Sequence, residues 1–233
     1  MGRGRPHRRS NDRNIRCTPA DLKVFIGIPV NRDFYVKTVG SLLNTIGALW
    51  VQGISHRISM QTDGYIDVNR SSVANEFLKS DFNVLFWIDQ DMVWKPEDFI
   101  RILVLTTKMD IVGATYVYKN DQMDFVVSKA EENTWNEYGC IPCEGLGLGF
   151  VAMTRKVVQT MADRSPEVSF ANLGAETKQF KYMFRPGPHE GTYQGEDITF
   201  FRECRDAGFQ PYLDPTITLG HAGTKVYSAS CVA

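Results

Sequence analysis

The sequence predicts a single α/β domain with a mixed, mostly parallel sheet flanked by helices. Between residues 23 and 118, short apolar, β-branched runs alternate with longer stretches whose apolar residues recur at helical spacing. The length of 233 residues suffices for one sizeable domain and not for two large ones. With 43% hydrophobic and 23% charged residues, the composition excludes wholesale disorder and a disulfide-dense miniature scaffold.

The first two strands and helices follow from this alternation. Lys23–Ile28 is apolar and β-branched, which predicts a buried first strand. The apolar residues of 33–51 are spaced as on one face of a helix, with Asp33 as the expected N-cap. A second strand is expected over 57–62 and an amphipathic helix over 69–79.

The next elements complete the repeating pattern. The third strand, expected over 83–88, is apolar on both faces, as in the middle of a parallel sheet. Pro96 and the two acids after it predict the first turn of a helix. A fourth strand is expected over 110–118. This order is typical of a doubly wound, Rossmann-like sheet with right-handed crossovers.

The second half of the chain is less regular. Residues 119–147 and 164–194 form polar, Gly- and Pro-rich connections, and long loops beside a regular sheet often carry function. The elements expected around them are a strand over 149–154, a helix over 155–163, a helix over 196–207 and a strand over 209–213.

The N-terminus differs from the rest in charge. Residues 1–16 carry six arginines against one acid, whereas the rest of the chain is mildly acidic. We expect residues 1–20 to be a disordered basic arm, either simply solvated or in contact with a polyanion such as nucleic acid. No apolar run is long enough for a membrane span, and no secretory signal is recognisable, so a cytoplasmic protein is expected.

Five cysteines are scattered along the chain. Cys140 and Cys143 have the spacing of half a zinc site or of a thiol–disulfide pair. The sequence offers no second close Cys/His pair, and Gly139 and Pro142 favour a loop. Reduced thiols are therefore expected.

The strongest chemical signal is Asp89-Gln90-Asp91, which directly follows the most apolar predicted strand. Ligands of such sheets bind outside the carboxyl ends of the strands. Two carboxylates leaving a buried strand are costly without a cation between them, and Mg²⁺ or Mn²⁺ bridging to a diphosphate would supply it. A solvated turn is the alternative interpretation of Asp-x-Asp.

Two further features stand out. Glu196 and Asp197 open a predicted helix, where they are either a simple N-terminal charge pair or include a general base. His221 has glycines on both sides, Gly220 and Gly223. It is either a structural residue or a further metal ligand. No phosphate-binding glycine loop follows a strand. The run Gly145-Leu-Gly147-Leu-Gly149 is interpreted as a close backbone approach to a ligand or to another loop.

Taken together, these pieces resemble the nucleotide-sugar-dependent glycosyltransferases of the GT-A fold, near the family-two enzymes and their compact viral and bacterial members. The likeness covers residues 23 to about 223. It rests on Phe25-Ile-Gly-Ile-Pro29, Arg70 with Ala74 and Phe77-Leu78, Leu85-Phe-Trp-Ile-Asp-Gln-Asp-Met92, Ile111-Val-Gly-Ala114 with Tyr116, Gly147 to Thr154, Gly195-Glu-Asp197 with Phe200, Ala207-Gly208 and Gly220-His221.

The resemblance implies a role for each matching residue. Asp91 would bind the metal directly, with His221 as a further ligand, and Asp89 would contact the ribose or reach the metal through water. Asp197, with Glu196 beside it, would supply the catalytic base of an inverting enzyme. The remaining expected contacts to the nucleotide sugar come from Pro29, Asn31, Asp63, Arg70 and Gln90.

The expected activity is therefore transfer of a sugar from a UDP- or GDP-sugar to a hydroxyl of a glycan or protein, with Mn²⁺ or Mg²⁺. Residues 21–118 would bind the nucleotide sugar and 119–225 the acceptor, with 226–233 as a tail. One alternative acceptor is a modified base of viral DNA, reached through the basic arm. Other classes considered are a nucleotidyltransferase, disfavoured because no glycine follows the first strand, and a non-catalytic nucleotide- or glycan-binding module.

Overall fold

The computed structural model describes residues 21–31, 33–62, 64–120, 122, 124–128, 130, 134–170, 178–223 and 226–231. The basic arm predicted over residues 1–20 lies outside the described residues.

The centre of the molecule is a seven-stranded sheet with the order β2-β1-β3-β9-β5-β14-β7. Strands β9 and β7 run antiparallel to the other five. This confirms the predicted mixed, mostly parallel α/β sheet. Its strands are β1 (Lys23–Pro29), β2 (Ser55–Gln61), β3 (Val84–Ile88), β5 (Ile111–Gly113), β7 (Ile141–Pro142), β9 (Phe150–Thr154) and β14 (Pro211–Leu213).

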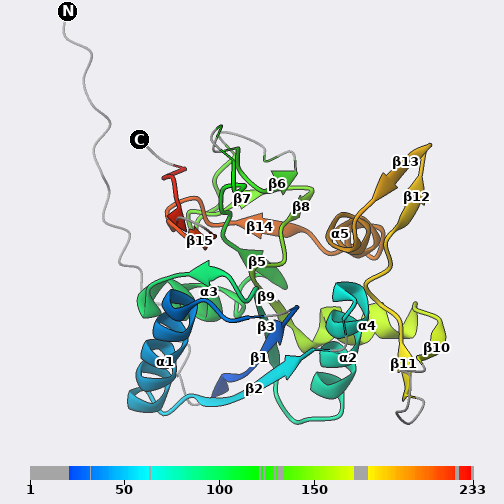
Figure 1. The fold of residues 1–233 in the computed structure, drawn as a ribbon, viewed down its shortest axis with the longest axis horizontal. Helices are drawn as coiled ribbons and strands as arrows, with labels where there is room; N and C mark the ends of the chain where they lie inside the picture. The colour runs from blue at the N-terminus through cyan, green and yellow to red at the C-terminus, as the bar shows by residue number, and fades with distance from the viewer. Residues whose placement is uncertain are drawn as a thin grey trace, which may run out of the picture.

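In the part of the chain that the structure describes, five helices cover the two faces of this sheet (Figure 1). On one face lie α1 (Val36–Val51) and α3 (Pro96–Leu105), and on the other α2 (Ile66–Leu78), α4 (Arg155–Asp163) and α5 (Glu196–Asp206). Within β3, Phe86 and Ile88 pack into the first core, whereas Leu85 and Trp87 pack into the second. The unbroken apolar sequence of β3 therefore reflects burial on both sides.

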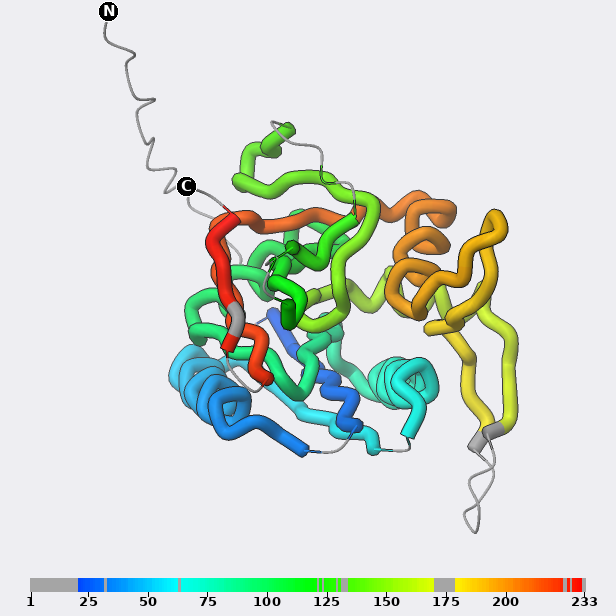
Figure 2. Tube along the Cα trace, turned by 45° about the horizontal axis from the view of Figure 1, so that its top comes forward, coloured from blue at the N-terminus to red at the C-terminus, as the bar shows by residue number. Residues whose placement is uncertain are grey.

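The polar connections contain short strands that the sequence did not predict. Two of these pairs are antiparallel and are visible at the edge of the molecule in Figure 2. The pairs are β10 (Glu167–Phe170) with β11 (Lys178–Lys181), β12 (Gly187–His189) with β13 (Thr192–Gln194), and β6 (Val127–Ser128) with β8 (Gly145–Leu146). A small sheet joins β4 (Met92–Val93), β15 (Gly220–Ala222) and β16 (Val226–Tyr227), so part of the predicted tail pairs with the domain.

Several predicted boundaries differ from those of the structure. The N-cap of α1 is Tyr35 and not Asp33, and α2 begins at Ile66, three residues before its predicted start. The strand predicted over 110–118 ends at Gly113, because the segment after it leaves the sheet. There the backbone pairs with residues 124–126, through Tyr118 N to Asp124 O and Val126 N to Tyr116 O.

Cys140 and Cys143 flank the edge strand β7. Cys140 and Cys143 are buried free thiols, and burial raises the pKa of each to about 12. A thiol with so high a pKa is a weak nucleophile at neutral pH. These residues therefore serve as small core side chains.

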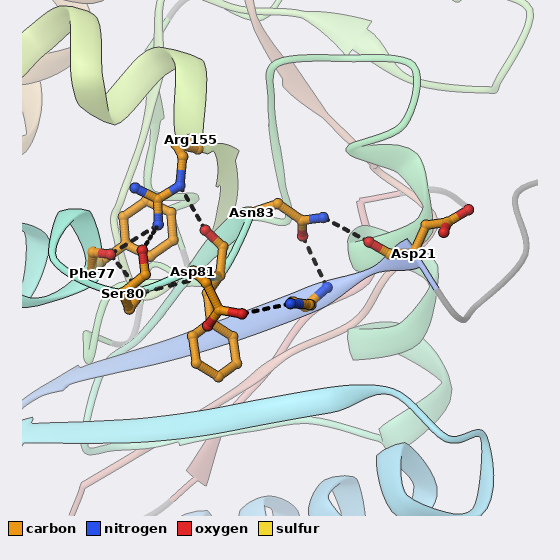
Figure 3. A network of polar contacts seen from close by, with 8 residues as sticks. Asp21, Phe77, Ser80, Asp81, Asn83 and Arg155 are labelled. Carbon is orange, nitrogen blue, oxygen red and sulfur yellow. Dashed lines mark hydrogen bonds and ion pairs between the residues drawn. The ribbon is translucent and has the colours of Figure 1, made fainter.

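Arg155, the first residue of α4, ties this helix to the end of α2 and to the turn before β3 (Figure 3). Its Nε donates to the carbonyl oxygen of Phe82 at 2.7 Å, and its Nη2 to those of Phe77 and Ser80 at 3.0 and 2.7 Å. Nη1 donates to Leu78 O at 3.2 Å. The guanidinium also lies 4.5 Å from the centroid of the Phe77 ring.

Replacing Arg155 by methionine is expected to lower the free energy of unfolding by about 3 kcal/mol. Four carbonyl oxygens would lose a charged donor, and the end of α2 would lose its link to α4. Urea unfolding followed by circular dichroism measures the change. Lys156→Met is the control, because exposed Lys156 makes one ion pair with Asp110. It should change stability by no more than about 0.5 kcal/mol, and equal losses in both variants would contradict the prediction.

Candidate active site

A cavity of about 580 Å³ opens at the carboxyl ends of β1 and β3. This is the edge at which ligands of α/β sheets bind. Most of the predicted site residues line it, namely Pro29, Asn31, Asp89, Gln90, Asp91, Asp197 and His221. Arg70 and Glu196 are not among the lining residues. Arg70 forms an ion pair with Asp89, which lines the cavity, and a second ion pair with Glu196. Asp63 lies outside the described residues, between Thr62 and Gly64.

Strand pairing explains why residues distant in the sequence meet here. β1 and β3 are parallel neighbours, so Pro29 and Asp89 emerge at the same edge of the sheet. β15 pairs antiparallel with β4, which places His221 opposite Met92 and therefore next to Asp91. The amide of Ala222 donates to Asp91 O at 2.7 Å and fixes this register.

Asp91 and His221 form a close pair. Nε2 of His221 lies 3.4 Å from Oδ2 of Asp91, and Nδ1 lies 2.9 Å from the carbonyl oxygen of Val117. Because a carbonyl oxygen only accepts hydrogen bonds, Nδ1 carries a proton and donates it to Val117 O, which leaves Nε2 facing Asp91. Burial raises the pKa of Asp91, but the contacts with His221 and Lys119 outweigh it and lower the pKa overall.

Arg70 forms ion pairs with two of the predicted site carboxylates, Asp89 and Glu196. Its side chain is only 2% exposed, with Nη2 2.8 Å from Asp89 Oδ1 and Nε 3.3 Å from Glu196 Oε1. The guanidinium also lies 5.5 Å from the centroid of the Trp87 ring. Burial lowers the pKa of Arg70, but the two carboxylates outweigh it and raise the pKa above the ordinary value. The guanidinium therefore stays charged and fixes Asp89 and Glu196 relative to each other.

Asp197 lies in the first turn of α5 and lines the cavity. One carboxylate oxygen accepts a hydrogen bond from the amide of Ile198 at 2.7 Å. Burial and the neighbouring charge of Glu196 raise the pKa of Asp197. A carboxylate with a raised pKa at a cavity wall is suited to accept a proton from a bound hydroxyl.

The glycine run before β9 packs against protein rather than leaving space for a ligand. A Cβ at Gly149 would lie 2.8 Å from the Tyr116 ring, and one at Gly145 would lie 3.1 Å from Phe201 Cβ. The predicted close approach was to a ligand or to another loop, and the glycines in fact approach Tyr116, in the segment after β5, and Phe201, in α5. The packing seats Tyr116 against the cavity, where its ring edge meets His221 at a centroid distance of 5.0 Å.

Sequence reasoning missed several residues at this site. Lys119 lies with Nζ 2.5 Å from Asp91 Oδ2, and its only sequence signal is its place just after a predicted strand. The cavity is also lined by Tyr65, Asp67, Asn69, Tyr118 and Val126, none of which carries a motif.

The donor set fits a divalent cation that takes other ligands from a bound diphosphate. No group of three or more His, Cys, Asp or Glu side chains within the described residues is arranged to hold a metal ion. Mg²⁺-type sites often use one or two carboxylates together with substrate phosphates. The hydrogen bond from Nδ1 of His221 to a backbone carbonyl is the usual support of a metal-binding imidazole. Asp91 and His221 therefore fit as two ligands.

Comparison with known proteins supports the fold assignment. No family model and no curated protein sequence matches this chain. The chain is similar to the crystal structure of A197 from STIV, with a TM-score of 0.54 and 18% identity over 87% of this chain and 86% of that one. At this identity, the likeness concerns the fold.

Two glycosyltransferases are among the further structural matches. One is a mutant of Drosophila beta-1,4-galactosyltransferase 7 in complex with manganese, UDP-Gal and xylobiose, with a TM-score of 0.47 and 16% identity over 90% of this chain and 70% of that one. The other is a glycosyltransferase involved in glycosylation of the major capsid of PBCV-1, with a TM-score of 0.34 and 10% identity over 59% of this chain and 62% of that one.

Among the helices that the structure describes, none is long and apolar enough to cross a bilayer.

Proposed function

We propose that this protein is a metal-dependent GT-A glycosyltransferase that moves a sugar from a nucleotide sugar to a hydroxyl acceptor. One observation carries the proposal. Asp89, Asp91, His221 and Asp197 line a single cavity at the carboxyl ends of the parallel strands. Such a cavity combines a cation-binding pair with a carboxylate suited to proton transfer.

Asp91 and His221 would hold the metal, Mn²⁺ or Mg²⁺, and Asp89 would lie at the ribose or at a metal-bound water. When bound, the metal would neutralise charge on the departing nucleoside diphosphate. Arg70 keeps Asp89 and Glu196 in place, so the carboxylate of Asp89 is oriented before the donor binds.

Asp197 would act as the base. Its raised pKa favours removal of a proton from the acceptor hydroxyl, whose oxygen would attack the anomeric carbon opposite the leaving diphosphate. This geometry would invert the configuration at the anomeric carbon, through a transition state resembling an oxocarbenium ion.

The nucleoside would bind at the end of β1. Pro29, Asn31 and Gln90 line this part of the cavity, and the amide of Asn31 donates to Gln90 Oε1 at 2.6 Å. Asp63 would contribute to recognition of the base. We propose a UDP- or GDP-sugar as donor, a glycan or protein hydroxyl as acceptor, and a cytoplasmic setting. A modified base of viral DNA is the alternative acceptor.

A thermal-shift series tests the proposal. UDP and GDP, each with Mn²⁺ or with EDTA, are added to the protein, and a ligand at a hundredfold excess over its Kd should stabilise the fold by about 2.7 kcal/mol. We expect one nucleotide to raise Tm only when Mn²⁺ is present, and Asp91→Ala to abolish this shift. The control Asp110→Ala removes an aspartate paired with exposed Lys156 outside the cavity and should keep the shift.

Release of nucleotide from UDP- and GDP-sugars then separates an enzyme from a binding module. Slow, Mn²⁺-dependent hydrolysis is expected, since water can take the place of the acceptor. Binding without any turnover would favour the non-catalytic module. No shift with either nucleotide, on folded protein with Mn²⁺, would contradict the proposal.

A further inference from the structure

Lys119 forms an ion pair with Asp91, the carboxylate that we propose as a metal ligand. Its Nζ lies 2.5 Å from Oδ2 of Asp91, the same oxygen that lies 3.4 Å from Nε2 of His221. The ammonium also lies 5.6 Å from the centroid of the Tyr35 ring. A built-in cation thus already neutralises the carboxylate that a metal would need.

The position of Lys119 is coupled to that of His221. The carbonyl oxygen of Val117, two residues earlier, accepts the hydrogen bond from Nδ1 of His221. Tyr118, between them, lines the cavity. One short segment therefore orients the imidazole and delivers the ammonium to the same carboxylate oxygen.

We propose that Lys119 competes with the divalent cation for Asp91, so that the protein without nucleotide binds metal weakly. Two positive charges at one carboxylate oxygen repel each other, and the metal has to displace the ammonium. Once displaced, the ammonium lies next to the cavity, where the diphosphate of a nucleotide is its natural partner. Metal and nucleotide would then bind cooperatively. This inference rests on the proposed function.

The test is Mn²⁺ binding without nucleotide, followed by the electron paramagnetic resonance signal of free Mn²⁺. We expect Lys119→Met to bind Mn²⁺ about 10-fold more tightly than the wild type, because a competing charge is gone. Lys156→Met is a matched control, since Lys156 also pairs with an aspartate, Asp110, and lies 5.1 Å from the centroid of an aromatic ring, that of Phe209. Its Mn²⁺ affinity should equal that of the wild type.

A second variant, Lys119→Gln, also removes the charge and replaces Lys119→Met in the test if that variant does not fold. Melting curves establish that each variant is folded. If both Lys119 variants bind Mn²⁺ no more tightly than the wild type, while Asp91→Asn loses binding, the competition is wrong and the metal site stands. If no protein binds Mn²⁺, alone or with UDP or GDP, the metal dependence of the proposed function fails, and this inference fails with it.

Discussion

Replacing Asp197 by asparagine is expected to lower kcat for sugar transfer about 1000-fold. Asparagine keeps the size of the side chain and its bond to the amide of Ile198, but it cannot accept the acceptor's proton. Initial rates with saturating donor and acceptor measure the effect. Nucleotide binding with Mn²⁺ should be unchanged, because we assign the cation to Asp91 and His221.

The stability of the Asp197→Asn variant separates this role from a structural one. In the wild type, the folded-state pKa of Asp197 is raised above the ordinary 3.8. The stability that its protonated carboxyl contributes is therefore lost as pH rises through the folded-state pKa. The asparagine variant has no such loss. Its Tm should therefore equal or exceed that of the wild type at pH 7, with the difference shrinking toward pH 4.

Asp206→Asn, at the exposed last position of the same helix, is the control and should leave kcat unchanged. A wild-type rate in Asp197→Asn would remove Asp197 from the mechanism.

Replacing Arg70 by methionine is expected to have the largest effect on stability, a loss of about 4 kcal/mol. The buried guanidinium pairs with both Asp89 and Glu196, and its removal would leave two mostly buried carboxylates without their counter-charge. Chemical denaturation at pH 7 measures the loss. The variant should also lose the Mn²⁺-dependent response to nucleotide, since Asp89 would no longer be fixed.

Arg57→Met is a matched control. Arg57 also pairs with a carboxylate, that of Glu76, and lies 5.6 Å from the centroid of the Phe25 ring, but its side chain is 52% exposed. Its replacement should cost no more than about 1 kcal/mol. Adding Glu196→Gln to Arg70→Met should recover part of the lost stability, because one unpaired charge disappears. Equal costs for Arg70→Met and Arg57→Met would contradict the buried-pair interpretation.

Part of the candidate site was predictable from local pattern. A strand that is apolar on both faces and ends in Asp89-Gln90-Asp91 identifies the carboxyl edge of a central strand, and the structure places both carboxylates at a cavity there. Parallel pairing of β1 with β3 brings Pro29 and Asn31 to the same cavity. His221 was singled out by its glycine neighbours and by the resemblance.

Other parts depend on contacts between distant segments. The burial of Arg70 between Asp89 and Glu196 needs α2 and α5 on one face of the sheet, and no local pattern encodes that. Lys119 reaches Asp91 because the chain leaves the sheet after Gly113, where continuous β propensity had predicted a longer strand. In the same way, the apolar sequence of β9 does not reveal that it runs antiparallel between β3 and β5.

The sequence by itself determined the elements that repeat a local pattern, since hydrophobic periodicity and turn residues act over a few positions. It also determined the carboxylates that follow the central strand, because their place depends only on that strand's end. The tertiary structure alone decided which charges meet, namely Arg70 with Asp89 and Glu196, and Lys119 with Asp91. Electrostatic pairing acts through space, and the partners come from segments whose approach is set by the packing of the whole sheet.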